Sequence, residues 1–424
     1  MDTQSQQSIL NKFKTKTIGT KLALLVLILP AAMLLVATIG FLCSQRSHMQ
    51  QTAQADIADK WGKEQTLIAP FLITHQTKTI NTTKYINSRT TQPDTKQVVI
   101  KNIYLPNSLD VNAELTPEIR YRGIYQSVVY TGCIQIKAKF KPSPNIDASS
   151  IGISTSDMDA ISNITATING TNVEFFHDTI EKRFFANIPQ NDLKKDLDVS
   201  LTITLRGSQK FSIDPIGQTN KIKISANWNS PSFIGKTLPT NRSITDTSFT
   251  ADWDISSLTT LYPKTEKYLH TPTKNVGVSL FVPIDIYSQV ERALTYSFLF
   301  ITMFVVSLLF AECITKMESN ITQYIIAICG PIIFYLLLLS FAEHIGFTPA
   351  FVLAAAMTSI LVSTYVGVVL NSKKAGCGIL ISLGISYILT FVLLRLENMA
   401  LLVGSLVLFF MLTLVMTITA KLNR

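Results

Sequence analysis

The chain has 424 residues, of which 47% are hydrophobic and 15% are charged, and its formal net charge is +9. This composition is too apolar for an ordinary soluble protein and too polar for a protein embedded in the membrane throughout. The average conceals two populations, because residues 292–420 carry almost no charge whereas residues 45–291 are rich in Thr, Asn, Lys and Asp. We therefore predict a soluble domain between a lone N-terminal membrane span and a C-terminal bundle.

Residues 1–20 are polar and basic, and we expect them to form a cytoplasmic tail. Residues 21–42 follow as the first transmembrane span, because about 20 apolar residues cross the hydrocarbon core of a bilayer. A signal peptide would have a shorter apolar core and an A-x-A-like cleavage site, so this span is predicted to remain as an anchor. Pro30 near its middle is expected to kink it.

Residues 43–291 are predicted to form a β-rich soluble domain, although the pattern does not decide between one lobe and two. An apolar residue at every second position predicts a half-buried strand. The clearest runs are residues 134–140, 197–205, 222–228 and 249–255. Asn169-Gly170 predicts a tight hairpin turn, since both residues tolerate positive φ. No long helical pattern separates these runs, so we expect an antiparallel, sandwich-like domain.

Residues 292–420 are predicted to form a bundle of five further spans, followed by a short cytoplasmic tail at residues 421–424. The spans are expected near residues 293–311, 321–341, 348–370, 376–394 and 399–420. Ser363 and Gly367 make a small-xxx-small pattern that allows two helices to approach closely.

The positions of the basic residues predict the orientation of the chain. With six spans, one face of the membrane receives nine basic residues, whereas the short connections on the other face offer only Arg395. The nine are Lys12, Lys14, Lys16, Lys21, Lys316, Lys373, Lys374, Lys421 and Arg424. By the positive-inside rule this face is cytoplasmic, and both termini are expected there. The net charge is thus a topology signal, and no nucleic-acid partner is expected.

The five cysteines predict neither a metal site nor a disulfide framework. Their spacing contains no C-x-x-C and no Cys/His cluster, so we expect no metal and no cofactor. A disulfide outside the bundle would have to join Cys43 to Cys133.

Polar residues gather at the predicted outer ends of the spans, whereas the middle of the five C-terminal spans has essentially no charge, which argues against an ion-coupled transporter. The outer group consists of Glu343, His344, Arg395 and Glu397. One interpretation is a functional cluster in which Glu343 or Glu397 pairs with Arg395 and His344 titrates near neutral pH. The alternative is a salt-bridge cluster that holds helix ends in place. No catalytic residues are predicted, because HExxH, GxSxG and Gly-rich phosphate loops are absent from the sequence.

The densest cluster of Pro, Gly and Asn in the soluble domain lies at residues 228–242. It predicts a rigid loop with Phe233 and Leu238 tucked beneath it, or alternatively a binding loop, since loops carry function more often than core strands do. The candidate binding residues are Trp228, Pro231, Phe233, Gly235, Pro239 and Arg242.

These segments, in this order, resemble the CreD family over nearly the whole chain. In the soluble domain the matching pieces are Trp61-Gly62-x-x-Gln65, Arg122-Gly123-Ile124-Tyr125, and the residues of the 228–242 segment with Phe249, Ala251 and Trp253. In the bundle they are Gln323-Tyr324, residues 334–340, Glu343-His344 with Phe347, and Leu396-Glu397. The residues after Ser156-Asp157 depart from the family pattern, as do Ala69 and Thr322. The resemblance implies an inner-membrane protein of a Gram-negative cell that acts in envelope integrity or stress response, and it implies no reaction.

We therefore expect a non-enzymatic protein that binds an envelope component or partner protein through its periplasmic domain. The bilayer and an envelope protein, peptidoglycan or a lipid are the expected partners. The alternative function is a transporter or lipid-handling protein that uses a cavity between the C-terminal spans. A membrane-embedded hydrolase would need a third catalytic residue beside Glu343 and His344.

Overall fold

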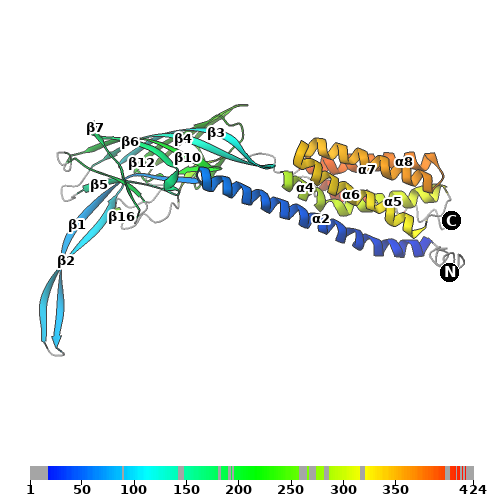
Figure 1. The fold of residues 1–424 in the computed structure, drawn as a ribbon, viewed down its shortest axis with the longest axis horizontal. Coiled ribbons are helices and arrows are strands. Elements are labelled where there is room, and N and C mark those ends of the chain that lie inside the picture. Colours follow the sequence, from blue (N-terminus) through cyan, green and yellow to red (C-terminus); the bar gives the residue numbers. More distant parts are fainter. Residues whose placement is uncertain are drawn as a thin grey trace. The chain divides into compact units, whose positions relative to one another are not determined.

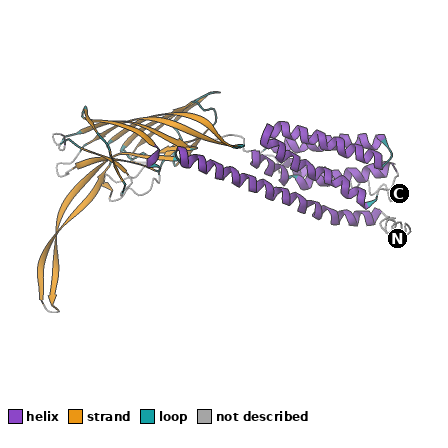
Figure 2. Cartoon of the chain, in the orientation of Figure 1, coloured by secondary structure: helices purple, strands orange, loops and turns teal. Residues whose placement is uncertain are grey.

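The computed structural model describes residues 18–87, 90–141, 148–179, 183–189, 192, 195–256, 265–266, 274–280, 286–315 and 320–396, with 402–406, 408–410, 413 and 416 near the C-terminus. The chain divides into two compact units. One unit comprises residues 1–50 and 284–424 and is helical, and the other comprises residues 51–283 and is built mainly of strands (Figure 2). We describe each unit by itself.

The strands of the β unit form two sheets (Figure 1). The described strands of the first sheet are β1 (Gln65–Asn87), β2 (Thr90–Tyr104), β5 (Ala148–Thr155), β8 (Phe176–Asp178), β9 (Arg183–Asn187), β11 (Lys210–Ile213), β13 (Pro231–Gly235), β16 (Thr265–Glu266) and β17 (Val276–Leu280). They are arranged β13-β17-β11-β1-β5-β9-β8, with β2 beside β1 and β16 beside β2.

The second sheet has the order β14-β15-β12-β3-β4-β10-β6-β7. Its described strands are β3 (Ser108–Arg122), β4 (Tyr125–Phe140), β6 (Ile161–Ile168), β7 (Thr171–Val173), β10 (Leu197–Ser208), β12 (Thr219–Ala226), β14 (Asn241–Ile244) and β15 (Phe249–Ser256). A short 3-10 helix, η1 (Met158–Ala160), precedes β6.

One hydrophobic core joins the two sheets. It contains Leu67 and Phe211 of the first sheet together with Ile136, Leu201 and Trp253 of the second, all buried. Apolar side chains on the inner faces of two stacked sheets form such a core. The β unit is therefore a single sandwich, which confirms the predicted fold class and decides for one lobe.

The alternating patterns correctly located β4, β10, β12 and β15 of the second sheet. Every second residue of β10 is buried from Leu197 onward, as the alternation predicts. Asn169 and Gly170 have φ values of 50° and 82° and join β6 to β7. Pairing is not antiparallel throughout, because β1 runs parallel to β11 and β12 runs parallel to β3. Strands from distant parts of the chain form these two pairs, so no hairpin dictates their direction.

The first helix, α2 (Ile18–Trp61), is longer than the predicted span. It includes Pro30 and continues without a break through the polar residues after Leu42. The other described helices are α4 (Ile286–Thr295), α5 (Ser297–Thr315), α6 (Ile321–Ile345), α7 (Phe347–Val369) and α8 (Lys373–Arg395). Among the described residues four helices are long and apolar enough to cross a membrane, or five if the bent pair α4 and α5 is one span.

The span predicted at residues 293–311 is not one straight helix. The chain bends by 48° between α4 and α5. At the bend the amide of Tyr296 donates to the carbonyl of Ala293 at 3.2 Å, three residues back instead of four, which tightens the turn. The span predicted at residues 399–420 lies largely outside the described residues.

Aromatic rings fill the centre of the bundle. Phe334 of α6 lies 4.6 Å from Tyr387 of α8 and 5.2 Å from Phe351 of α7, measured between ring centroids. A methyl group on Gly376 of α8 would lie 2.9 Å from the carbonyl oxygen of Ser363 and 3.1 Å from the Cα of Gly367. The small-xxx-small pattern thus marks a real close approach of α7 and α8.

Candidate functional site

Glu343 lies in the last turn of α6, where a helix ends abruptly. Gly346 has a φ of 79°, and its amide donates to the carbonyl of Ala342 at 3.1 Å, after which α7 begins at Phe347. The C-terminal end of a helix carries partial negative charge and disfavours a carboxylate. The charge of Glu343 therefore requires compensation from other helices.

Two side chains provide that compensation. The hydroxyl of Tyr287 in α4 donates to Oε1 of Glu343 at 3.0 Å, and Nε of Arg46 in α2 lies 3.7 Å from the same oxygen. The Glu343 side chain is only 9% exposed. Beside it, the thiol of Cys43 lies 3.6 Å from the carbonyl oxygen of Tyr287. The arrangement joins α2, α4 and α6 through one buried carboxylate.

The predicted outer cluster is only partly assembled. His344 is exposed, and its Nδ1 lies 3.1 Å from the carbonyl oxygen of Ser340 in its own helix. Arg395 lies above the ring of Phe391, and Glu397 lies outside the described residues. Among the described contacts, Glu343 meets Arg46 and Tyr287 where the sequence suggested Arg395.

Sequence reasoning missed Arg46 because this residue lies beyond the predicted first span, which was expected to end at Leu42. Arg46 follows that span by four positions, which was the available signal. A second unexpected cation is Arg292 of α4, whose Nη2 donates to the carbonyl of Leu394 at 3.0 Å near the end of α8.

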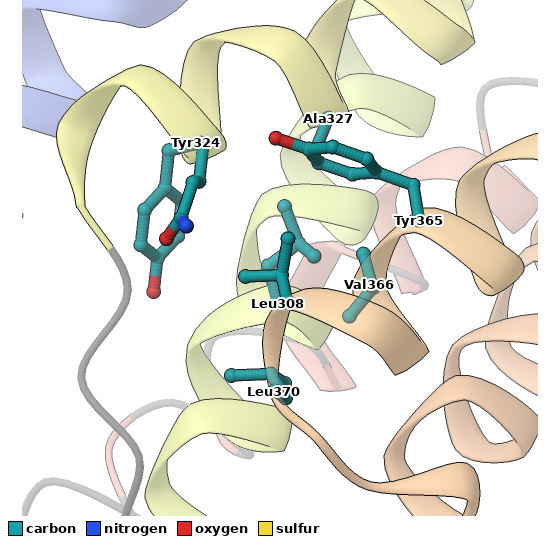
Figure 3. A pocket seen from close by; sticks show the side chains of 8 residues that line it. Leu308, Tyr324, Ala327, Tyr365, Val366 and Leu370 are labelled. Atoms are coloured by element: carbon teal, nitrogen blue, oxygen red, sulfur yellow. The ribbon is translucent and has the colours of Figure 1, made fainter.

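At the ends where α5 stops and α6 starts, a second carboxylate is buried. Glu312 accepts a hydrogen bond from the hydroxyl of Tyr324. A cavity of about 20 Å³ lies beside Tyr324, and Tyr365 of α7 contributes to its wall (Figure 3). That volume holds about one water molecule. The remaining walls consist mainly of apolar side chains, including Leu308 and Val366.

The 228–242 segment is not a loop along its whole length. Residues 231–235 form β13 at one edge of the first sheet, and residues 241–244 form β14 at one edge of the second. The ring of Phe233 packs edge-on against Phe249 at 6.1 Å and Trp253 at 6.0 Å. Phe233 is thus tucked against the core as predicted.

The rest of that segment is partly exposed. Leu238 is 69% exposed, so the prediction that it tucks beneath the loop is wrong. Pro231 and Pro239 are half-buried, Trp228 is half-buried and packs against the core, and Arg242 is exposed. Gly235 has a φ of 108°, and a Cβ there would overlap the carbonyl of Asn275, which explains glycine at this position.

The Trp61-Gly62-x-x-Gln65 motif meets Ser156-Asp157 where α2 leads into β1. The buried side chain of Gln65 donates to the carbonyl of Arg206 at 3.1 Å and accepts from the hydroxyl of Thr155 at 2.5 Å. Asp157 accepts from the amide of Lys63 at 2.8 Å, and the hydroxyl of Ser156 accepts from the amide of Thr66 at 3.0 Å. These contacts give Ser156-Asp157 a structural role.

Two guanidinium groups lie near the ring of Trp61. That of Arg120 is 3.7 Å from the ring centroid and that of Arg206 is 5.4 Å away, while the indole nitrogen donates to the carbonyl of Tyr130 at 3.2 Å. Burial raises the pKa of the Tyr130 hydroxyl well above its ordinary value. These contacts fix the end of α2 to the second sheet.

Beside Trp61 lies a basic groove of about 370 Å³, which sequence reasoning did not find. It is lined by Asp56, Ile57, Lys60, Trp61, Arg120, Tyr121 and Arg122. Asp56 pairs with both Lys60 and Arg122. Arg120 pairs with Glu118 at 2.7 Å, so three cations and two carboxylates meet here, and the remaining positive charge suits an anionic ligand. Within the described part of the chain, no three His, Cys, Asp or Glu residues gather as metal ligands.

Comparisons with known proteins extend the resemblance. The family model described as "Inner membrane protein CreD" matches residues 13–424. The inner membrane protein CreD of Escherichia coli strain K12 is 29% identical over 289 residues, an alignment that covers 64% of this chain and 64% of that protein.

Solved structures give only weak likenesses. Legionella pneumophila aminopeptidase A has a TM-score of 0.22 at 13% identity and covers 42% of this chain and 21% of its own. A putative protease from Parabacteroides distasonis has a TM-score of 0.20 at 9% identity, over 63% of this chain and 59% of its own. These scores are too low to support any statement about activity.

Proposed function

The chain belongs to the CreD family of inner membrane proteins, and from this premise we propose that it supports the integrity of the cell envelope by binding an envelope component through its β unit. The proposed topology places the β unit in the periplasm and both termini in the cytoplasm, because the basic residues flank the spans on one side. We propose no catalytic step. The stress-response role is part of the same proposal.

The observation that carries this proposal is the pair of sheet edges made by β13 and β14. A strand at a sheet edge presents unpaired amide and carbonyl groups to which another chain can add. Along β14 all four residues are exposed, and Ile244 and the preceding Leu238 add apolar surface. An extended segment of a partner protein is the ligand that suits such an edge.

The alternative, transport or lipid handling through a cavity between the spans, has less support. The cavity beside Tyr324 has room for about one water molecule, and the rings of Phe334, Phe351 and Tyr387 pack against one another at the centre of the bundle. A transported solute or lipid would need these rings to separate.

A crosslinking experiment in cells tests the proposal. A photo-reactive amino acid is placed at Leu238 or Ile244 of the full chain, and at Phe176 as the control. Phe176 lies on β8, at another edge of the first sheet, and is 51% exposed. We expect a distinct envelope protein to be captured from positions 238 and 244 alone. Equal capture of abundant porins at all three positions would count against partner binding.

A genetic test complements the crosslinking. Leu238→Asp and Ile244→Asp place charges on the exposed edge without altering the core. We expect both variants to accumulate normally and to fail to restore detergent and β-lactam tolerance to a strain that lacks the native protein. Full restoration of tolerance by both variants would contradict a role for this edge in partner binding.

A further inference from the structure

The hairpin of β3 and β4 extends beyond the core of the sandwich. The inward-facing positions of β3 are buried up to Leu115, but Ile119 and Tyr121 on the same face are 42% and 68% exposed. Ile124 in the turn is 46% exposed, and every residue from 118 to 124 faces solvent. The hairpin tip, which we define as Ile119, Tyr121 and Ile124, thus presents bulky apolar side chains with no core to cover them.

The opposite face of this hairpin follows α2. Arg120 stacks on Trp61, whereas Arg122, two residues nearer the turn, pairs with Asp56, one helical turn further back along α2. On the returning strand the carbonyl of Gln126 accepts from the side chain of Gln54 at 3.0 Å. The turn therefore points along α2, away from Trp61 and toward Asp56 and Gln54.

The hairpin contacts the same helix that contains the first candidate membrane span, because α2 runs without a break from Ile18 to Trp61. One continuous helix therefore links the hairpin to a membrane interface.

The side chains have the chemistry of such an interface. Tyr121 combines a ring with a hydroxyl, which favours the level of the headgroups. The basic groove behind the tip contributes Lys60, Arg120 and Arg122, which outnumber the two carboxylates paired with them, Asp56 and Glu118. Cations near an anionic leaflet are attracted to its surface.

We propose that the hairpin tip and the basic groove together dock on the membrane surface by binding the headgroups of anionic phospholipids. The apolar side chains enter the headgroup layer while the arginines meet phosphate groups. This docking goes beyond the edge-strand interaction proposed above and does not depend on it, because it involves a different sheet position and a lipid instead of a protein.

The test uses the full chain in nanodiscs of phosphatidylcholine, alone or mixed with phosphatidylglycerol. In a cysteine-free background, Ile124→Cys carries an environment-sensitive fluorophore and headgroup spin-labelled lipids act as quenchers. Ile244→Cys is the matched control, because Ile124 and Ile244 are 46% and 47% exposed. We expect strong quenching and a blue shift at position 124 in the anionic discs and neither at position 244.

Charge variants and added phosphate identify the ligand of the groove. Arg120→Ala and Arg122→Ala should each lower the ratio of docked to undocked hairpin by about fivefold in anionic discs. Adding inorganic phosphate to phosphatidylcholine discs should leave position 124 unchanged, whereas a response there would assign the groove to free phosphate and overturn the proposal. Equal quenching at positions 124 and 244 would overturn the proposal as well. So would the absence of lipid quenching at position 124 together with protection of that position by a protein in cells.

Discussion

Two carboxylates in different parts of the molecule face arginines, and their surroundings differ. Glu343 in the bundle is 9% exposed and is held by Arg46 and Tyr287. Asp56 in the β unit is 34% exposed and is held by Arg122 and Lys60. A buried carboxylate depends on each partner because no water replaces a lost one, whereas an exposed carboxylate is rehydrated. We therefore expect the loss of one partner to cost more stability at Glu343 than at Asp56.

The largest effect should come from removing the hydroxyl that donates to Glu343. Tyr287→Phe leaves a buried carboxylate oxygen without its donor, which should cost about 2 kcal/mol, the range for a hydrogen bond to a charged group. Thermal unfolding of the full chain in detergent measures this loss. Tyr121→Phe is the control, because that side chain is exposed and removing its hydroxyl should not shift the midpoint. A midpoint unchanged in both variants would mean that water reaches Glu343.

A smaller effect is expected from neutralising the same carboxylate. Glu343→Gln keeps an acceptor for Tyr287 but loses the attraction of Arg46, so the cost should be about 1 kcal/mol. Complementation of envelope tolerance at matched protein levels shows whether the charge has a further role. If Glu343→Gln accumulates normally but restores no tolerance, the cluster functions in more than helix packing.

A still smaller effect should follow at Asp56. Asp56→Asn removes two exposed ion pairs and should cost below about 1 kcal/mol, an amount that disappears near 1 M salt because exposed charges are screened. Unfolding in low and high salt provides the comparison. A cost as large as that of Tyr287→Phe, and independent of salt, would break the contrast between the two carboxylates.

The smallest effect is expected at His344. Its ring is exposed and its described contact is with a carbonyl of its own helix, so His344→Ala should change stability by less than about 0.5 kcal/mol. Envelope tolerance should be restored in full. Failure to restore tolerance at normal protein levels would show that the histidine has a role beyond its contact within α6.

The long helices and several strands of this protein could be predicted from short stretches of sequence. Apolar runs of membrane-spanning length located α6, α7 and α8, alternation located β10 and β15, and Asn169-Gly170 marked a hairpin. These features are predictable because each depends on residues close together in the chain. The class of fold followed from their order.

The partners of individual side chains, in contrast, depend on the folded chain. Arg46 pairs with Glu343, and Trp61 contacts Arg120 and Arg206, across sequence separations that no local pattern encodes. Likewise, nothing in residues 228–242 shows that their two ends complete different sheets. Charged groups and aromatic rings interact with the groups that the fold brings close to them. The sequence therefore shows which groups need a partner, and the fold determines which partner they have.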